Sequence, residues 1–396
     1  MKNKMKVLQL PSWYIPEGGQ FCLEQSKALK KQGINVKILA NVTLPWKKYN
    51  INILKYPIST FWSTEENIET FRYYSWRIPL LHMENITKWI NKTLTLFDEY
   101  IKQVEKPDII HTHSSMWGGV AAARIKEKYN IPYVLTEHQG LFGQKSNLSK
   151  EQILPEYVPL YKEAFSNADY IIPVSEQQIK KISSFFNKEE IPIKAISNIV
   201  DIDFFSSSNN KKDNEKFIFF TANSYCAEKA YDILLPAFDI VCEEISNVQL
   251  RIAGRNFLNN KEFCSLLKTT KNKEKIEFCG YLSPLEIRNE LWNADSFVLS
   301  SRIESQSISV LESLSTGLPV VCTEVVPKQV CKDFCGYHVP IENPEALAQA
   351  MIEMVKNRKN FDKQKIRSHV ESIASPQVVA SQIIEIYEEV LLKMKK

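Results

Sequence analysis

Long apolar runs are missing from this chain of 396 residues. No hydrophobic stretch reaches the roughly 18 residues that a membrane-spanning helix needs. The segment MKNKMKVLQLPSWY begins with basic residues, but its apolar part is shorter than that of a secretory signal, and Gln9 and Pro11 interrupt it. These absences predict a cytoplasmic protein.

Paired metal-binding cysteines are also absent. The eight cysteines are scattered, and none forms a C-x-x-C pair. Cys331, Cys335 and His338 could hold a metal ion, but a fourth ligand is missing nearby, and zinc sites usually have tighter paired spacing. Buried thiols without a metal are the alternative, and we expect no metal site.

The dinucleotide fingerprint G-x-G-x-x-G and the basic-aromatic motifs of nucleic-acid-binding domains are absent as well. The net charge is +4, but residues 1–200 hold 26 Lys and Arg against 19 Asp and Glu, which leaves 24 against 27 for the rest. A basic first half could meet an anionic membrane surface or a phosphorylated substrate, and solvated surface lysines would give the same count. We expect no nucleic-acid partner.

What the sequence does contain is a repeated alternation of short β-rich runs and amphipathic stretches. KVLQL, VKILA, PDIIHTH and IPYVLTEH are typical of strands, and FCLEQSKALKKQG is typical of a helix. After a polar stretch at 206–216, the alternation begins again with FIFFTA and continues to LPVVCT. The pattern predicts an α/β fold of two Rossmann-like βαβ domains that face a cleft.

The polar stretch gives the predicted domain boundary. We expect a first domain over residues 1–205, a second over 206–375, and a C-terminal helix over 376–396. In open parallel sheets, ligands bind at the carboxyl ends of the strands. The residues that directly follow strands are therefore the candidates for chemistry.

Three features follow strands of the predicted first domain. Gly18 and Gly19 directly precede a helix, so a ligand could approach the backbone there, although a simple turn has the same pattern. His111 and His113 end one strand on the same side, which would suit a metal ion, but no third ligand is evident. His138 ends the next strand and is the better candidate for contact with a substrate.

Two charged features stand near the start of the predicted second domain. Lys229 follows its first strand at the head of a helix, where an ammonium group could point at a phosphate, although a surface lysine is the simpler alternative. Asp201 and Asp203 form a D-x-D pattern beside the polar stretch, and we interpret them as a connector rather than as metal ligands.

The stretch SRIESQSISVLESLSTGLPVV, residues 301–321, combines two acids with a helix start. Glu304 lies in the loop before the predicted helix, and Glu312 lies in its second turn. The backbone N–H groups near Ile308 and Ser309 would be free at the helix N-terminus and could hold a diphosphate. Carboxylates on either side could accept hydrogen bonds from sugar hydroxyls.

These residues resemble a GT-B glycosyltransferase of family 4, a retaining, metal-independent group that uses nucleotide sugars. The resemblance covers nearly the whole chain, from the Gly18–Gly19 loop through PDIIHTH, TEHQG, ADYIIPVS, SNIVDIDFF and AEKAYDILLPAF to ADSFVLSSRIESQSISVLESLSTGLPVV. The last segment is the most specific, because it carries the family's E-x7-E motif as Glu304 and Glu312.

The resemblance implies roles for the candidate residues. His138 would lie near the reacting sugar, Lys229 would neutralise the diphosphate, and Glu304 would contact the donor sugar. The nucleotide would be held by the ribose-binding Glu312 and by the amides of Ile308 and Ser309. Asp201 and Asp203 would belong to the connector, and the last helix would return to pack on the first, acceptor-binding domain.

The chain also departs from the family's pattern. The family usually has an Arg five positions before the lysine and a Gly just after it, where this chain has Ser224 and Ala230. Ser224 removes a bidentate phosphate donor, which weakens donor binding unless another cation, such as Arg255 or Arg302, substitutes. The usual Gly-Phe-Gly after the first glutamate reads Ser-Gln-Ser, which leaves the donor sugar open.

The resemblance therefore implies transfer of a sugar from a nucleotide-diphosphate sugar to a hydroxyl. We expect a UDP-sugar, or alternatively a GDP-sugar, as donor, no cofactor, and a glycan or lipid-linked acceptor of bacterial surface polysaccharide synthesis at the inner face of the membrane. Two alternatives stay open: a nucleotide-sugar epimerase of the same fold, and a non-catalytic nucleotide-sugar-binding protein.

Overall fold

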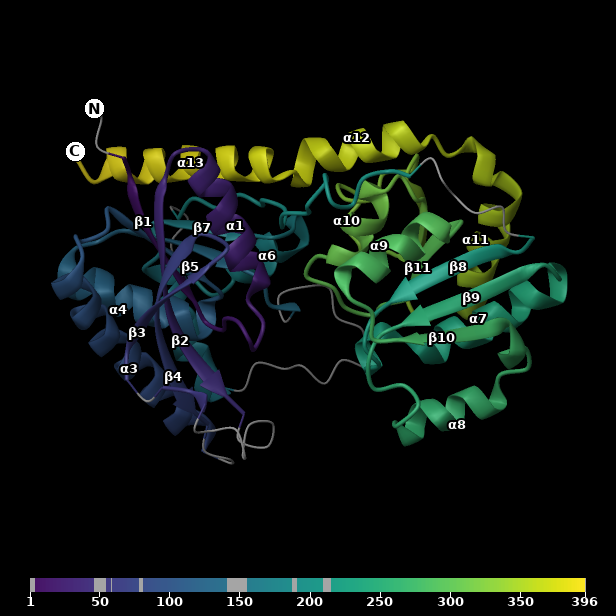
Figure 1. Ribbon diagram of the computed structural model, residues 1–396, viewed down its shortest axis with the longest axis horizontal. Coiled ribbons are helices and arrows are strands. Elements are labelled where there is room, and N and C mark those ends of the chain that lie inside the picture. Colours follow the sequence, from purple (N-terminus) through teal and green to yellow (C-terminus); the bar gives the residue numbers. More distant parts are fainter. Residues whose placement is uncertain are drawn as a thin grey trace. The chain divides into compact units, whose positions relative to one another are not determined.

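The computed structural model describes residues 4–45, 55–57, 59–77, 81–140, 155–186, 191–208 and 215–395. The chain divides into two compact units (Figure 1). Unit 1 comprises Met1–Gln139, Ile153–Ile199 and Pro376–Lys396, and unit 2 comprises Gly140–Gln152 and Val200–Ser375. Most of the polar stretch predicted as a linker, residues 209–214, lies outside the described residues.

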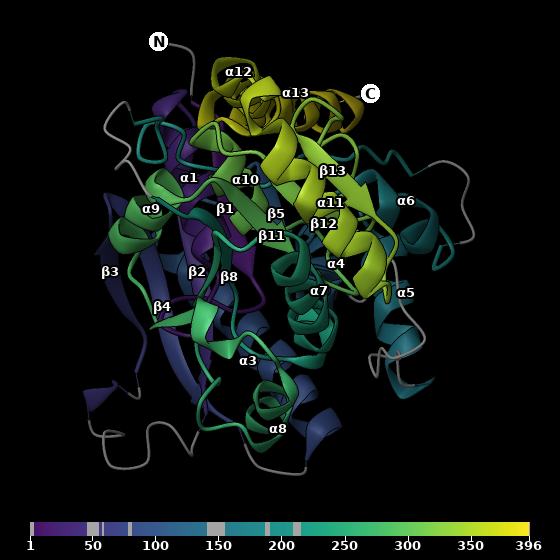
Figure 2. The ribbon, with the colours of Figure 1, turned by 90° about the vertical axis from the view of Figure 1, so that its right-hand side faces the viewer.

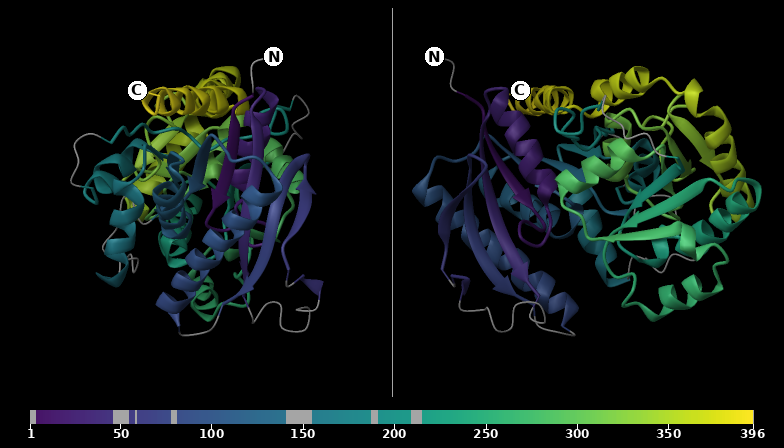
Figure 3. Two further views of the ribbon diagram at one scale, coloured as in Figure 1. Left: turned by 90° about the vertical axis from the view of Figure 1, so that its left-hand side faces the viewer. Right: turned by 45° about the vertical axis from the view of Figure 1, so that its right-hand side comes forward.

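In the described part of the chain, unit 1 contains a seven-stranded sheet in the order β3-β4-β2-β1-β5-β6-β7. The strand pairs are parallel except for the pairing of β3 with β4. Figure 3 shows the twist of this sheet. The strands are β1 (Lys6–Pro11), β2 (Asn35–Leu44), β3 (Phe61–Glu65), β4 (Ile68–Trp76), β5 (Ile109–His113), β6 (Tyr133–Glu137) and β7 (Tyr170–Pro173).

The helices of unit 1 come from both ends of the sequence. They are α1 (Gln20–Lys31), α3 (His82–Gln103), α4 (Val120–Tyr129), α5 (Val158–Ser166), α6 (Glu176–Ser183) and α13 (Pro376–Lys393), with short helical turns at Ser115–Gly119 and Pro155–Tyr157. On β2, alternate residues face opposite sides of the sheet, so Val36 joins the core beneath α1 and α13, whereas Asn41 donates hydrogen bonds to α3.

The last helix packs on the first part of the chain. Val379, Ile383, Ile386 and Val390 of α13 recur at helical spacing and are buried against α1 and the sheet. Figure 1 shows α13 in yellow beside α1 in purple. The predicted return of the C-terminal helix is confirmed.

Unit 2 repeats the architecture with six parallel strands, within the described residues, in the order β10-β9-β8-β11-β12-β13. The strands are β8 (Phe217–Ala222), β9 (Val248–Ala253), β10 (Ile276–Gly280), β11 (Ser296–Leu299), β12 (Val320–Thr323) and β13 (Gly336–Val339). The predicted α/β class with two Rossmann-like sheets is confirmed.

Most helices of unit 2 begin at side-chain caps that the sequence contains. Ser283 and Glu286 form a capping box, and Asn343 accepts a hydrogen bond from the Ala346 amide at 2.8 Å. Helices α7 and α11 lie side by side in Figure 2. The helices are α7 (Tyr231–Glu244), α8 (Lys261–Thr269), α9 (Pro284–Asn293), α10 (Ile308–Ser315), α11 (Pro344–Asn357) and α12 (Lys363–Ala374), with single turns at Ala227–Lys229, Lys273–Lys275 and Arg358–Asn360.

Among the described residues, no helix is both long enough and apolar enough to cross a bilayer.

Candidate functional site

The carboxyl ends of β8 and β11 bring together two of the predicted site residues of unit 2. Lys229 ends the single helical turn after β8, and Glu304 lies in the loop after β11. The Lys229 Nζ lies 2.6 Å from Glu304 Oε1, and the Ser301 hydroxyl donates to the same oxygen at 2.8 Å. The predicted phosphate ligand and the predicted sugar ligand are therefore ion-paired, although they stand 75 residues apart in the sequence.

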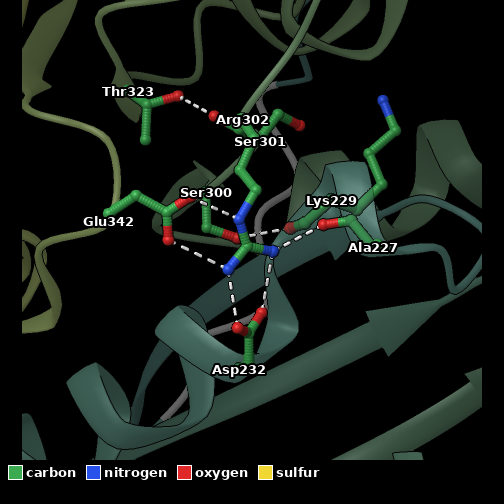
Figure 4. Close-up of polar contacts among 8 residues, drawn as sticks. All are labelled: Ala227, Lys229, Asp232, Ser300, Ser301, Arg302, Thr323 and Glu342. Atoms are coloured by element: carbon green, nitrogen blue, oxygen red, sulfur yellow. Dashed lines mark hydrogen bonds and ion pairs between the residues drawn. The ribbon is translucent and has the colours of Figure 1, made fainter. Parts of the chain in front are cut away.

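Arg302 holds this loop in place (Figure 4). Its buried guanidinium makes five hydrogen bonds: two to Asp232, two to Glu342 and one to the Ala227 carbonyl. These bonds use all five N–H donors of an arginine side chain. Arg302 therefore has no donor left for a phosphate, and it is not the substitute for the family's missing arginine.

Arg255 is the remaining candidate for that substitution. Its carbonyl accepts a hydrogen bond from the Tyr225 amide at 3.0 Å, so its backbone lies beside the loop of Ser224. Its exposed guanidinium lies over the Tyr281 ring, 3.9 Å from the centroid. No carboxylate among the described residues is ion-paired with Arg255, which leaves its charge available to a ligand.

Glu312 is set apart from the paired carboxylates. It lies in the second turn of α10, as predicted, and its partly buried carboxylate makes no hydrogen bond or ion pair with any described residue. Burial raises the pKa of the Glu312 carboxyl to about 7. Such a carboxylate would gain from hydroxyl donors that a ligand supplies.

The start of α10 is not capped by a side chain. Ser307 occupies the N-cap position, but its hydroxyl is hydrogen-bonded to the Ser309 hydroxyl at 3.0 Å rather than to a backbone amide. The first amides of the helix, at Ile308 and Ser309, have no acceptor within the helix. They could donate hydrogen bonds to a phosphate, and that role stays a prediction.

In unit 1, Gly18 and Gly19 adopt positive φ angles of 103° and 75°. A Cβ on Gly19 would lie 2.3 Å from the Trp13 carbonyl oxygen, so only glycine allows the loop to close against itself before α1. The loop geometry explains both glycines without a ligand, and the approach of a ligand to their backbone stays a prediction.

The strand-end histidines form a buried hydrogen-bonded cluster. His111 bonds to the Tyr387 hydroxyl at 2.5 Å and to the Thr136 hydroxyl at 2.7 Å, and His113 bonds to Gln9 Oε1 at 2.6 Å. The second nitrogen of His113 lies 3.0 Å from His138. Because protein groups occupy all four nitrogens of His111 and His113, these side chains are not free to bind a metal.

The cluster also fixes how His138 is protonated. The Gln9 amide oxygen can only accept, so His113 donates to it, and the other His113 nitrogen must accept from the Nε2–H of His138. Burial lowers the pKa of His138 to about 3, and the ring stacks on Phe21 at 3.8 Å. His138 is thus a neutral, fixed ring, which suits contact with a sugar better than proton transfer.

Two groups of this cluster were not indicated by the sequence. Gln9 was noted only because it interrupts an apolar run, and Tyr387 lies on α13, 276 residues after His111. A polar residue inside a β-rich run is the one signal that could have indicated Gln9.

The thiols that lie together differ from the set considered in the sequence. The ligand atoms of Cys322, Cys331 and His338 lie within 4.8 Å of one another, whereas Cys335 is not part of this group. Cys322 joins because it is the strand partner of His338. A hydrogen bond with Cys322, together with burial, holds the pKa of the Cys331 thiol well above its usual value, which disfavours the thiolate that a metal needs.

Asp201 has a local structural role. Its carboxylate accepts a hydrogen bond from the Phe204 amide at 3.0 Å and its carbonyl accepts one from Phe205, which closes a turn. Asp203 is exposed. This geometry fits the connector interpretation of the D-x-D pattern.

Comparison with known proteins gives two family matches that together extend over most of the chain. Residues 18–204 match the model of "Glycosyltransferase Family 4", and residues 201–369 match that of "Glycosyl transferases group 1". The boundary between the matches lies near the boundary between the units.

Individual relatives are distant. A Bacillus subtilis protein named as a teichuronic acid biosynthesis glycosyltransferase, TuaC, is 24% identical, with 81% of each chain covered. An Escherichia coli UDP-Gal:alpha-D-GlcNAc-diphosphoundecaprenol alpha-1,3-galactosyltransferase is 23% identical, with 64% of this chain and 68% of that protein covered. The solved structure of Anabaena HepE with UDP and glucose aligns with a TM-score of 0.73 at 14% identity, over 97% of this chain and 100% of that one.

Proposed function

The chain belongs to the group 1 and family 4 glycosyltransferases, which use nucleotide sugars, and we propose that it is a retaining enzyme that works without a metal ion. In this proposal a sugar passes from a UDP-sugar, or alternatively a GDP-sugar, to a hydroxyl of a glycan or a lipid-linked acceptor. The structure of HepE with UDP and glucose and the name of the galactosyltransferase relative support UDP.

Glu312 carries the proposal. A partly buried carboxylate with a pKa near 7 and no partner among the described residues is unfavourable in the free protein. Two ribose hydroxyls would supply the donors that it lacks. Its position in the second turn of α10 leaves the uncapped helix start for the diphosphate.

The leaving diphosphate develops negative charge as the bond to the sugar breaks. Lys229, the first amides of α10 and Arg255 are the groups that we assign to this charge. In the free protein Lys229 is paired with Glu304 at 2.6 Å. A bound diphosphate would compete for the ammonium group and leave Glu304 to accept hydrogen bonds from the donor sugar.

The chemistry that we propose is attack on the face from which the diphosphate leaves. The bond from the anomeric carbon to the phosphate oxygen breaks, a bond to the acceptor oxygen forms, and the hydroxyl proton passes to the leaving phosphate. His138, held neutral, would contact the reacting sugar rather than take this proton. Retention follows because the new bond forms on the face of the old one.

For the acceptor and the location, the support comes from the names of relatives. TuaC is named for teichuronic acid biosynthesis, and the galactosyltransferase relative is named for a diphosphoundecaprenol acceptor. We therefore propose a role in surface polysaccharide synthesis, with the protein acting at the inner face of the cell membrane.

Calorimetric titration of UDP and GDP into the wild type and into Glu312→Ala tests the proposal. The variant should bind at least about 30-fold more weakly, because two charge-assisted hydrogen bonds to ribose are lost. Glu371→Ala is the matched control, since Glu371 is an exposed glutamate on α12 of the same unit. Wild-type affinity in Glu312→Ala would contradict the proposed donor site. In a separate incubation with a UDP-sugar alone, an isomerised sugar would favour an epimerase.

A further inference from the structure

Two neighbouring pockets lie within unit 1, on residues to which donor binding assigns no role. The first has a volume of about 330 Å³ and the second of about 280 Å³. Thr43, Arg77 and Trp117 line both, so the two pockets are contiguous. A ligand longer than one sugar ring could occupy them together.

The second pocket is cationic. Lys88 and Lys92 are four residues apart on α3 and therefore lie on one face of the helix, and Arg77 follows β4. No carboxylate is among the described residues that line this pocket. Nor is any described carboxylate ion-paired with these three cations. Three like charges around one cavity repel one another, and an anion would relieve that repulsion.

The cations are held in place without being neutralised. The Lys92 ammonium lies over the Tyr73 ring, 4.1 Å from its centroid, and the Arg77 guanidinium is hydrogen-bonded to His82 at 3.0 Å. Both contacts orient a side chain and leave its positive charge in place. Arg77 and Lys92 are therefore already oriented in the second pocket before an anion binds.

The first pocket has a different lining. Trp13 and Trp117 present aromatic surfaces, and the polar side chains of Glu17 and Gln139 also line the pocket. Flat apolar faces with a few polar groups suit a sugar ring, whose C–H faces pack on aromatics while its hydroxyls need partners. Gln139 directly follows His138, so a sugar here would lie beside the residue assigned to the reacting sugar.

We propose that the two pockets bind an acceptor that carries a phosphate or diphosphate group. The acceptor sugar occupies the first pocket, and its phosphate lies among Arg77, Lys88 and Lys92 in the second. This inference rests on the proposed function and narrows the acceptor to a glycosyl phosphate, either lipid-linked or free.

Glucose 1-phosphate is a suitable probe, with glucose as its uncharged counterpart. Both are titrated into the full chain by saturation-transfer NMR, with UDP at saturation so that the donor's own phosphate site is occupied. Glucose 1-phosphate should bind at least about tenfold more tightly than glucose, and added salt should reduce that difference.

The pocket is tested with charge variants. Lys88→Ala combined with Lys92→Ala should weaken glucose 1-phosphate binding about tenfold or more and leave glucose binding unchanged. Lys88→Arg with Lys92→Arg should stay within about threefold of the wild type, because the charges remain. Lys102→Ala, an exposed lysine on the same helix, is the control.

The lipid and free sources are separated by one more probe, glucose linked through a diphosphate to a farnesyl chain. Tighter binding than glucose 1-phosphate identifies a lipid-linked acceptor, and equal binding identifies a free glycosyl phosphate. Wild-type affinity for glucose 1-phosphate in the double alanine variant overturns the proposal. Titration of UDP into the wild type separates this outcome from a failure of the proposed function, because a wild type that does not bind UDP would contradict the proposed function itself.

Discussion

Each unit places titratable side chains at the carboxyl ends of its strands, but the two sets are satisfied in different ways. In unit 1, the nitrogens of His111 and His113 are bonded to Gln9, Tyr387, Thr136 and His138. In unit 2, Glu312 makes no side-chain bond with a described residue. Lys229 and Glu304 form an ion pair that a ligand could separate.

The difference indicates that the network of unit 1 orients side chains, whereas the unpaired carboxylate of unit 2 favours ligand binding. A closed network in the interior fixes rings and tautomers but offers few groups to a ligand. A carboxylate without a partner is unfavourable until a ligand supplies donors, so it favours the bound state. Unit 1 thus holds His138 in one state, whereas unit 2 leaves Glu312 to a ligand, which in the proposed function is a nucleotide.

The largest effect is expected where charge is needed in the transition state. Lys229→Ala should lower kcat about 100-fold or more, because the leaving diphosphate loses its cation. Affinity for UDP should fall less, since in the proposed site Glu312 still binds ribose. Steady-state release of UDP measures kcat, and calorimetric titration measures the affinity for UDP. Lys268→Ala, an exposed lysine on α8, is the control, and an unchanged kcat at saturating donor would remove Lys229 from the mechanism.

The closed network of unit 1 is broken by His113→Ala. Gln9 and His138 then lose a buried partner, and a cavity remains, so the free energy of unfolding should fall by about 3 kcal/mol. Urea unfolding monitored by circular dichroism gives this value. The matched change His82→Ala, at an exposed histidine, should stay within about 0.5 kcal/mol of the wild type. Equal stability of the two variants would show that the network is not a stabilising unit.

Sequence patterns predicted the parts of this molecule that depend on local chemistry. The β-rich runs gave most strands of both sheets but not β3, β4 or β13, and the family's spacing gave Glu304 and Glu312 on a loop and a helix. Lys229 was identified from its position after a strand. Each of these inferences needs only a few neighbouring residues, because strand alternation and helix starts are local properties.

The remaining features depend on long-range packing. Tyr387 reaches His111 across 276 residues, and Arg302 finds Asp232 and Glu342 at separations of 70 and 40. Arg302 was considered as a phosphate ligand because its charge was visible in the sequence and its two carboxylate partners were not. Cys322 likewise joined the thiol cluster through strand pairing with His338.

The buried histidines of unit 1 and Glu312 of unit 2 should respond to pH in opposite directions. In unit 1, burial holds the pKa of His111 and of His138 at about 3, below the ordinary histidine value. The unfolded chain therefore takes up protons first, and each ring lowers stability by about 1.4 kcal/mol between about pH 8 and pH 5.5. In unit 2, the pKa of Glu312 is raised to about 7, so the folded state takes up the proton first and gains about 2 kcal/mol over the same range.

Hydrogen exchange read by mass spectrometry resolves this contrast, after correction for the intrinsic pH dependence of exchange. Protection in β5 and β6 should fall as the pH is lowered to about 5.5, and protection in α10 should rise. Glu312→Gln, which cannot ionise, should remove the rise in α10 and leave the fall in β5 and β6. The same sign of change in both units would show that the two environments do not differ as described.

The smallest effect concerns the backbone beside Lys229. Ala230 adopts φ 51° and ψ 50°, the left-handed region in which a Cβ is unfavourable, and it stands where the family usually has glycine. Ala230→Gly relieves this strain but adds freedom to the unfolded chain, and the first effect should prevail, with about 1 kcal/mol of added stability. Thermal unfolding measures it, and Ala237→Gly within α7 should destabilise by about the same amount or more, because alanine is favoured there. If both glycine variants lose stability, the backbone at Ala230 is not strained. The difference between the two units would then lie in their side chains and not in their backbones.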